Sequence, residues 1–331
     1  AYYEEVNKNG GIHGRKIRVV VEDDKCDPNE TNAVARKLVG GSNVFMLNGG
    51  SCTAAIVSLQ EYVTREKIPY VVLNGSGDGA IVPPTRYVFG GFPGTQRTIG
   101  AAITQFAAGH LEAKKIYYLS SDDDYGRSNA GAARSIAERE NVTFENAFVP
   151  PNVNDMTSIV LAVRQSDPDV IVSALYPAPT VLLVRKLAEF GIDKPIVQGI
   201  QGVPVPETFV RNVDNTDALS NFFYSSPLND LVDGPKQQPW LDLFEQYNPG
   251  KKPSGFMAYG FPSAMAVVKG LEGAGRELTR EGFIDALEQV SFESEVMAGP
   301  IVFGPDRRDG LRDQVIYKFD GNTHELMPGI Y

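Results

Sequence analysis

Histidine, cysteine and tryptophan are scarce in this chain of 331 residues, which has three His, two Cys and one Trp. The His and Cys residues are scattered, so the spacing typical of a zinc site is absent and no metal is expected. No stretch approaches the roughly 18–20 apolar residues that a membrane-spanning helix needs. The composition therefore predicts a soluble globular chain without a bound metal.

Positive charge is also in deficit. Lys and Arg total 31 against 41 Asp and Glu, which gives a formal net charge of −10. The sequence contains no dense Lys/Arg run of the kind that contacts a phosphate backbone. We therefore do not expect a nucleic acid as a partner.

The familiar catalytic motifs are missing. A dinucleotide-binding oxidoreductase needs G-x-G-x-x-G between a strand and a helix, and the Gly-rich residues 74–79 (NGSGDG) lack that spacing. A serine hydrolase needs G-x-S-x-G on a sharp turn, and this pentapeptide does not occur. We expect binding without turnover, and no cofactor.

What the sequence does contain is a repeated alternation of strands and helices. β-Branched runs at 16–23, 115–119 and 169–175 predict strands, and periodic apolar residues at 96–108 and 124–140 predict helices. Such alternation indicates parallel sheets that are covered by helices. At about 150 residues per domain, the length suggests two such lobes. Ligands of such sheets bind at the carboxyl ends of the strands.

Several segments together resemble one family. They are EEVNKNGGIHGRKIRVVVEDD at 4–24, AVARKLV at 33–39, DDDYG at 122–126, DMTSIVLAVRQSDPDVIV at 155–172 and GPIVFGPDRRDG at 299–310. Each is a weak signature alone, but they follow the family order over nearly the whole chain. The chain resembles the periplasmic solute-binding receptors of ABC transporters, in the leucine/isoleucine/valine-binding group.

The resemblance implies an α/β fold of the type I periplasmic binding protein class, with two doubly wound α/β lobes joined by three crossings. The N-terminal lobe would comprise residues 1–93 plus 228–311, and the C-terminal lobe residues 96–225 plus 314–331. Family members begin with a strand and a Gly/Ser-rich turn, whereas this sequence begins inside the helix that follows. We therefore expect the first strand of the N-terminal lobe to be missing.

The resemblance also implies a function, partners and a location. We expect a monomeric receptor that closes on a small-molecule ligand and delivers it to the membrane permease of an ABC importer. It would lie in the periplasm, or be membrane-anchored outside a Gram-positive cell. The precursor would carry a signal peptide that the mature chain lacks.

Two cysteines, Cys26 and Cys52, are compatible with one disulfide or with two free thiols by composition alone. The resemblance favours a disulfide that joins two loops of the N-terminal lobe.

The residues expected to contact the ligand follow from the turns and positions where the family has its contacts, except Phe256, which is chosen because it opens a long helix that could border the cleft. They lie in strand-end turns and at helix starts, and are Ser51, Thr53, Asn74, Ser76, Asp78, Gln96, Tyr125, Tyr176, Gln201 and Phe256. Hydroxyl and backbone N–H groups near Ser51 and Ser76 suit a carboxylate, although Asp78 stands where a threonine is common and would repel one. Tyr125 and Tyr176 offer flat apolar surface.

Two glutamines indicate the class of ligand. In amino-acid-binding relatives, acidic residues near the positions of Gln96 and Gln201 bind the ligand ammonium, and an amide carries no charge. A buried ammonium without a counter-charge is costly. We therefore expect a small organic acid, aromatic or branched, without an α-ammonium group. An amino-acid receptor and a ligand-sensing regulator of the same fold are the alternatives, although no helix-turn-helix segment precedes the lobes.

Overall fold

The computed structural model describes residues 1–331 except for 75–77, 82–84, 205, 231–233, 254 and 320–321. Contacts within the chain divide it into two units, each made of two separate stretches. Unit 1 comprises residues 1–95 and 230–312, and unit 2 comprises residues 96–229 and 313–331. None of the described helices is long and apolar enough to cross a membrane.

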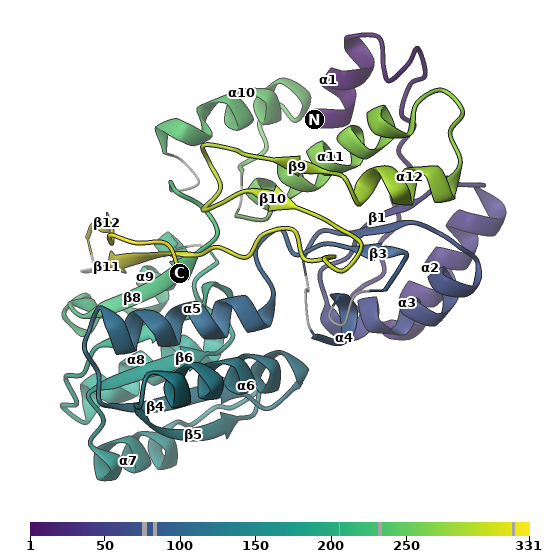
Figure 1. Cartoon of the computed structure of the whole chain (residues 1–331). Helices are drawn as coiled ribbons and strands as arrows, with labels where there is room; N and C mark the ends of the chain where they lie inside the picture. Colours follow the sequence, from purple (N-terminus) through teal and green to yellow (C-terminus); the bar gives the residue numbers. More distant parts are fainter. Residues whose placement is uncertain (75–77, 82–84, 205, 231–233, 254, 320–321) are drawn as a thin grey trace. The chain divides into compact units, whose positions relative to one another are not determined.

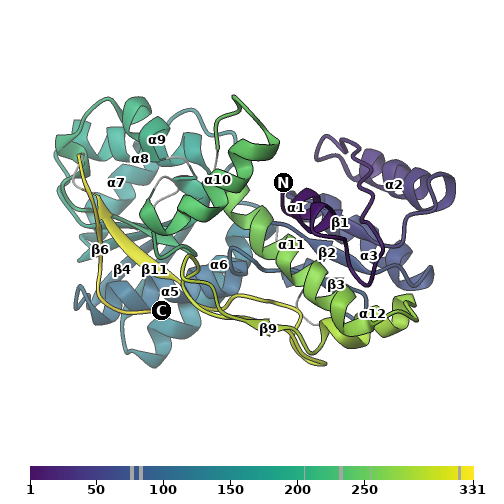
Figure 2. The same cartoon turned by 90° about the horizontal axis from the view of Figure 1, so that it is seen from above.

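Unit 1 is built around a parallel three-stranded sheet in the order β1-β2-β3. Its strands are β1 (Leu47–Gly49), β2 (Tyr70–Val72) and β3 (Val88–Phe89), with a separate antiparallel pair β9 (Ser291–Phe292) and β10 (Ile301–Val302). Its helices are α1 (Tyr2–Lys8), α2 (Pro28–Arg36), α3 (Thr53–Arg65), α4 (Asp78–Ile81), α10 (Gln238–Tyr247), α11 (Gly255–Ala274) and α12 (Arg280–Leu287). The strands lie between α2 and α3 on one side and α11 and α12 on the other (Figures 1 and 2).

Local chemistry explains where the first helices of unit 1 begin and which face they bury. The Asp27 carboxylate accepts hydrogen bonds from the backbone N–H groups of Asn29 and Glu30, and Pro28 occupies the first helical position of α2. In α3, Ile56 and Leu59 are spaced to lie on one face and are buried against the sheet. The helices thereby cover the apolar side of the sheet.

The strand predicted over residues 16–23 is wrong as a paired strand. This segment is extended but joins no sheet, and Val19 and Val21 are 51% and 84% exposed. The β-branched pattern correctly indicates extended backbone, but a strand also needs a neighbour that accepts its hydrogen bonds. No described strand pairs with it.

Unit 2 contains a seven-stranded sheet in the order β12-β11-β8-β7-β6-β4-β5. The strands are β4 (Lys115–Ser121), β5 (Thr143–Val149), β6 (Val170–Ala174), β7 (Ile196–Gln198), β8 (Phe222–Ser226), β11 (Val315–Phe319) and β12 (His324–Leu326). Strands β4 to β8 are parallel, and β11 runs antiparallel to β8 and β12. The helices are α5 (Gln96–Gly109), α6 (Asp124–Arg139), α7 (Thr157–Ser166), α8 (Pro177–Glu189) and α9 (Pro206–Val213).

The order of these strands reverses between β4 and β6. From β4 the chain moves to β5 at one edge through α6, and it then returns past β4 to β6, β7 and β8. Because such crossovers are right-handed, α6 lies on one face and α7 to α9 lie on the other. Helix α5 packs beside α6 (Figure 1). The carboxyl ends of β4 and β6 therefore form the topological switch point of the sheet, where open α/β sheets bind ligands.

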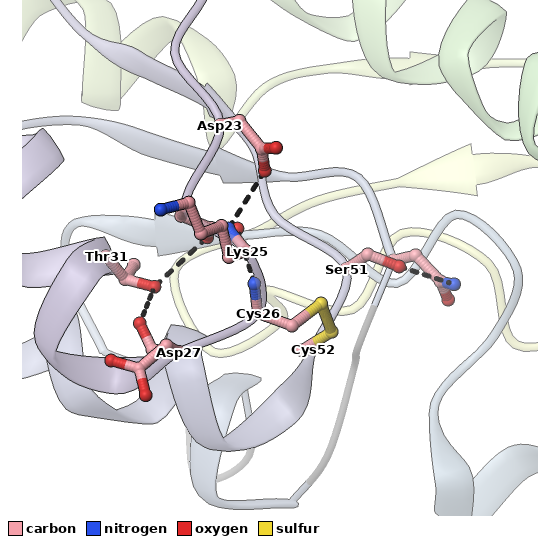
Figure 3. The surroundings of a disulfide bond; sticks show 9 residues. Asp23, Lys25, Cys26, Asp27, Thr31, Ser51 and Cys52 are labelled. Atoms are coloured by element: carbon pink, nitrogen blue, oxygen red, sulfur yellow. Dashed lines mark hydrogen bonds between the residues drawn. A yellow bond between two sulfur atoms is a disulfide. The ribbon is translucent and has the colours of Figure 1, made fainter.

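A disulfide joins Cys26 to Cys52, as the resemblance implied, with 5.5 Å between the Cα atoms (Figure 3). Cys26 directly precedes the capping residue Asp27 of α2, and Cys52 precedes the first residue of α3. The Cys26 N–H also donates to Asp24 Oδ1 at 3.1 Å. The bond thus ties the end of the extended segment to the turn that follows β1.

We expect the Cys26→Ser/Cys52→Ser double variant to lose about 3 kcal/mol of unfolding free energy, because the bridge closes a loop of 26 residues in the unfolded chain. Urea denaturation of the oxidised protein and the variant measures this difference. The oxidised protein treated with a reductant should match the variant. Equal stability of all three, or two free thiols in the exported protein by mass analysis, would contradict the role of the bridge.

Candidate functional site

Two tyrosines lie at the switch point of unit 2. Tyr125 is in the first turn of α6, directly after β4, and Tyr176 precedes the first residue of α8, directly after β6. Since β4 and β6 are neighbours, the two rings meet with their centroids 5.1 Å apart and their planes inclined at 32°. The structure therefore brings these two predicted residues together as one aromatic surface.

The hydroxyls of this tyrosine pair differ in their partners. Tyr125 is 4% exposed, and its hydroxyl has no hydrogen-bond partner among the described residues. Tyr176 is half-buried, and its hydroxyl lies near the carboxylate of Asp123. Burial raises the pKa of both hydroxyls, and the charge of Asp123 adds to the shift at Tyr176. Both phenols are therefore protonated near neutral pH and can donate hydrogen bonds.

Two glycines allow the backbone to approach this pair closely. A Cβ at Gly126 would overlap the backbone of Ser121, so the DDDYG turn can fold onto the end of β4 only with glycine there. A Cβ at Gly199, just after β7, would lie 3.6 Å from the Tyr125 hydroxyl and 3.1 Å from Ile99. The end of β7 therefore borders the hydroxyl of Tyr125.

Gln96 is the first residue of α5 in unit 2. Its side chain is 4% exposed, and its Oε1 accepts no hydrogen bond from the residues that the structure describes. Residues three apart share a helix face, so Gln96 lies on the same face as Ile99, which contacts Gly199. Unpaired buried polar atoms are uncommon in folded proteins and call for a specific explanation.

Gln201 lies in a short 3₁₀ turn, Ile200–Gly202, that follows β7. Its side chain is partly exposed and makes interactions of its own. The structure thus places Gln201 beyond the end of a strand that neighbours β6, in the same unit as the tyrosine pair.

A buried glutamine that the sequence analysis did not select, Gln198, holds these strand ends together. Its Nε2 donates to the carbonyl oxygens of Leu175 at 3.1 Å and Gly199 at 2.8 Å, and its Oε1 accepts from the hydroxyls of Ser173 and Thr180. The side chain is fully buried. In the sequence, the signal that could have pointed to Gln198 is a polar residue directly after the apolar residues 195–197 (PIV).

Asp123 is the second residue that the sequence analysis did not select. Its Oδ1 accepts from the Gly126 N–H at 3.0 Å and caps α6, and its charge also acts on the Tyr176 hydroxyl nearby. An Asp just before the first residue of a helix is a typical cap, because its carboxylate can accept the N–H of the third helical residue, here Gly126. The pairing of β4 with β6 places it beside Tyr176 as well, which the sequence alone does not indicate.

In unit 1, three predicted residues lie at the carboxyl ends of β1 and β2. Asn74 is buried, and its Nδ2 donates to the exposed Ser51 hydroxyl at 3.4 Å. Thr53 opens α3, and the N-cap position, Cys52, provides no side-chain hydrogen bond to the first turn. Gly50 has a φ of +84°, which a side chain rarely adopts. The N–H groups of the first turn of α3, which no N-cap side chain bonds, and the Ser51 hydroxyl are donors that suit an anion.

Three predicted residues cannot be placed in this way. Ser76 lies outside the described residues. The backbone of Asp78 opens α4, and that of Phe256 is in the first turn of α11, but their side chains are not described. Among the described residues, no group of three or more His, Cys, Asp or Glu is arranged to hold a metal.

The environments of Tyr125 and Gln198 predict a small and a large effect of substitution on stability. Tyr125→Phe removes a hydroxyl without a partner, so the unfolding free energy should stay within about 0.5 kcal/mol of the parent. Gln198→Met leaves buried partners unpaired and should cost about 2–3 kcal/mol. Urea denaturation followed by circular dichroism measures both. A loss for Tyr125→Phe as large as that for Gln198→Met would show that the hydroxyl has a structural partner.

Comparison with known proteins supports the fold and the family. The sequence pattern of the family described as "Periplasmic binding protein" matches residues 1–323. The Leu/Ile/Val-binding protein homolog 8 of Brucella abortus is 26% identical over 196 residues, which are 57% of this chain and 48% of that protein. The match thus spans about half the length of this curated relative.

Solved structures share the fold over almost the whole chain. The branched-chain amino acid transporter substrate-binding protein of Streptococcus pneumoniae, in complex with isoleucine, has a TM-score of 0.79 and 24% identity, with 98% of this chain and 91% of that chain covered. A solute-binding protein of an ABC transporter from Rhodopseudomonas palustris, in complex with 3,4-dihydroxybenzoic acid, has a TM-score of 0.77 and 19% identity over 98% and 89%.

These comparisons confirm the predicted α/β fold of the type I periplasmic binding proteins. They also confirm the expectation of a binding protein rather than an enzyme. The chain belongs to the periplasmic binding protein family.

Proposed function

We propose that this protein is an extracytoplasmic receptor that binds a small organic acid, aromatic or branched, and delivers it to the permease of an ABC importer. The observation that carries the choice of ligand is the tyrosine pair of unit 2, together with two uncharged atoms that no described residue pairs, the Tyr125 hydroxyl and Gln96 Oε1. Family membership supports the receptor role.

The tyrosine pair suits the apolar part of such a ligand. Two rings at the switch point offer a flat surface against which a ring or a branched chain packs favourably. The Tyr125 hydroxyl can donate to a ligand oxygen, and Gln96 Oε1 can accept from a ligand hydroxyl. Binding would thus pair two atoms that no described residue pairs.

Unit 1 also contains donors that suit a carboxylate. Ser51 can donate its hydroxyl, and the first turn of α3 has backbone N–H groups that no N-cap side chain takes up. The positive end of the helix dipole stabilises an anion at this place by a further few tenths of a kcal/mol to about 1 kcal/mol. Asn74 would position Ser51 through the hydrogen bond between them.

An amino-acid receptor is the second candidate, and one observation favours it. The Asp123 carboxylate lies at Tyr176 and supplies a negative charge that the glutamines do not. A half-buried carboxylate can stabilise an ammonium, although Asp123 already accepts from the Gly126 N–H. The names of relatives include leucine, isoleucine and valine binding, and one structural neighbour holds isoleucine.

Matched ligand pairs separate these two candidates by calorimetry. Leucine and 4-methyl-2-oxopentanoate share a branched chain and a carboxylate, and only leucine carries an ammonium. We expect binding of the keto acid or of a hydroxybenzoate and none of leucine, because a buried ammonium without a counter-charge costs several kcal/mol. A true ligand at 100 times its dissociation constant should stabilise the protein by about 2.7 kcal/mol.

Variants that add or remove a charge provide a second test of the ligand class. Gln201→Glu should weaken binding of the acid and introduce binding of the matching amino acid, whereas Gln165→Glu, on the exposed surface of α7, should change neither. If the parent binds leucine and Asp123→Asn abolishes that binding, the amino-acid candidate is correct and our assignment of the ligand class is wrong.

A further inference from the structure

The amide of Gln198 lies between two turns of unit 2 that carry residues expected to contact the solute. One turn joins β6 to α8 and contains Tyr176, and the other follows β7 and contains Gln201. Gln198 is the last residue of β7 and pairs with Ser173 of β6, so its fully buried side chain stands where both turns begin. A change in this one side chain can therefore act on both turns.

The first set of contacts holds the turn with Tyr176. Gln198 Nε2 donates to the carbonyl oxygen of Leu175, the residue directly before Tyr176, at 3.1 Å. The Thr180 hydroxyl lies 2.8 Å from the carbonyl oxygen of Tyr176 and 3.4 Å from Gln198 Oε1. The amide therefore holds the backbone on both sides of the Tyr176 side chain, directly at Leu175 and through Thr180 at the Tyr176 carbonyl group.

The second set of contacts holds the turn with Gln201. Gln198 Nε2 also donates to the carbonyl oxygen of Gly199 at 2.8 Å, which fixes the entry to this turn. A Cβ at Gly202 would lie 2.3 Å from Gln198 Nε2, so the turn Ile200–Gly202 rests on the amide and needs glycine at its end. The backbone on either side of Gln201 is thus positioned by the same side chain.

Only an amide in this orientation pairs all of these neighbours. Its oxygen faces the hydroxyls of Ser173 and Thr180, which can donate, and its nitrogen faces the carbonyl oxygens of Leu175 and Gly199, which can only accept. An ionised glutamate at position 198 would have no hydrogen for the two carbonyl oxygens, and a methionine has none either. Since these groups are buried, loss of the amide leaves them without a donor and frees both turns.

We propose that Gln198 is a positioning residue for solute recognition in unit 2, and that its amide fixes the backbone that carries Tyr176 and Gln201. This inference rests on the proposed function, in which those two residues contact the solute. Gly199, which Gln198 also holds, borders the Tyr125 hydroxyl, since a Cβ there would lie 3.6 Å from it. The two tyrosine rings are inclined at 32°, and a change of this angle alters which flat or branched groups pack against them.

Fluorine NMR of protein labelled with 3-fluorotyrosine tests the positioning role without any ligand. The Tyr176→Phe variant identifies the Tyr176 resonance by its loss. We expect Gln198→Met to shift or broaden this resonance, because the turn loses its hydrogen bond at Leu175. Val170→Ala, at the opposite end of β6, is the control: it removes buried apolar contacts and should lower the stability while the Tyr176 resonance stays as in the parent.

The Gln198→Glu variant separates the loss of the donor from the change of shape. Burial and two facing carbonyl oxygens raise the pKa of the introduced carboxyl, and its protonated form can donate one hydrogen bond. The Tyr176 resonance should therefore be displaced at pH 8 and return toward the parental position at pH 5. Asp123, Tyr125 and Tyr176 are present in all variants compared, so the parent and Gln198→Met account for their titration. A displacement that does not reverse at pH 5 would contradict the role of the donor.

Calorimetry connects this positioning to recognition, with 4-hydroxybenzoate, 4-methyl-2-oxopentanoate and leucine as the probes. Whichever of them the parent binds should bind Gln198→Met roughly tenfold more weakly and Val170→Ala within about twofold. A parent that binds none of the acids contradicts the proposed ligand class, and the NMR result then decides on Gln198 alone. An unchanged Tyr176 resonance in Gln198→Met, or equal effects of Gln198→Met and Val170→Ala on resonance and affinity, overturns the positioning role.

Discussion

The parallel pairing of β4 with β6 determines where the candidate site of unit 2 lies. Residues 116–120 pair with residues 170–174, and this register brings the turn after each strand to the same edge of the sheet. Tyr125 and Tyr176 meet there, Asp123 caps α6 beside them, and Gln198 fixes the neighbouring strand ends through buried hydrogen bonds. The chemistry of the site thus depends on backbone hydrogen bonds that are remote from any ligand, because a shift of register would separate the two rings.

The elements of unit 2 could be predicted from the sequence because apolar periodicity and helix caps are local signals. The DDDYG turn and the run DVIVSAL place Tyr125 and Tyr176 at strand ends by their local pattern alone. The role of Gln198 could not be predicted, because a glutamine at a strand end gains meaning only from partners up to 25 residues away in the chain. Residues 16–23 have a clear strand pattern, yet pairing is a property of a neighbour that the local sequence does not encode.

Unit 1 differs from unit 2 in how fully its sheet satisfies the backbone. The seven strands of unit 2 are paired side by side, whereas the three strands of unit 1 lie beside an extended segment that pairs with none of them. The disulfide joins this segment to the turn after β1, which also contains Ser51. The disulfide thus limits how far the extended segment and the turn with Ser51 can move apart.

The central claim is that the tyrosine pair and the uncharged Tyr125 hydroxyl and Gln96 Oε1 select a ligand without an ammonium. A crystal structure of the protein purified from its native source, with the ligand that it retains, tests this claim most directly. The account predicts an organic acid packed against Tyr176 and Tyr125, with a ligand oxygen within hydrogen-bond distance of the Tyr125 hydroxyl and no ligand cation. An α-amino acid whose ammonium lies on the Asp123 carboxylate would contradict it.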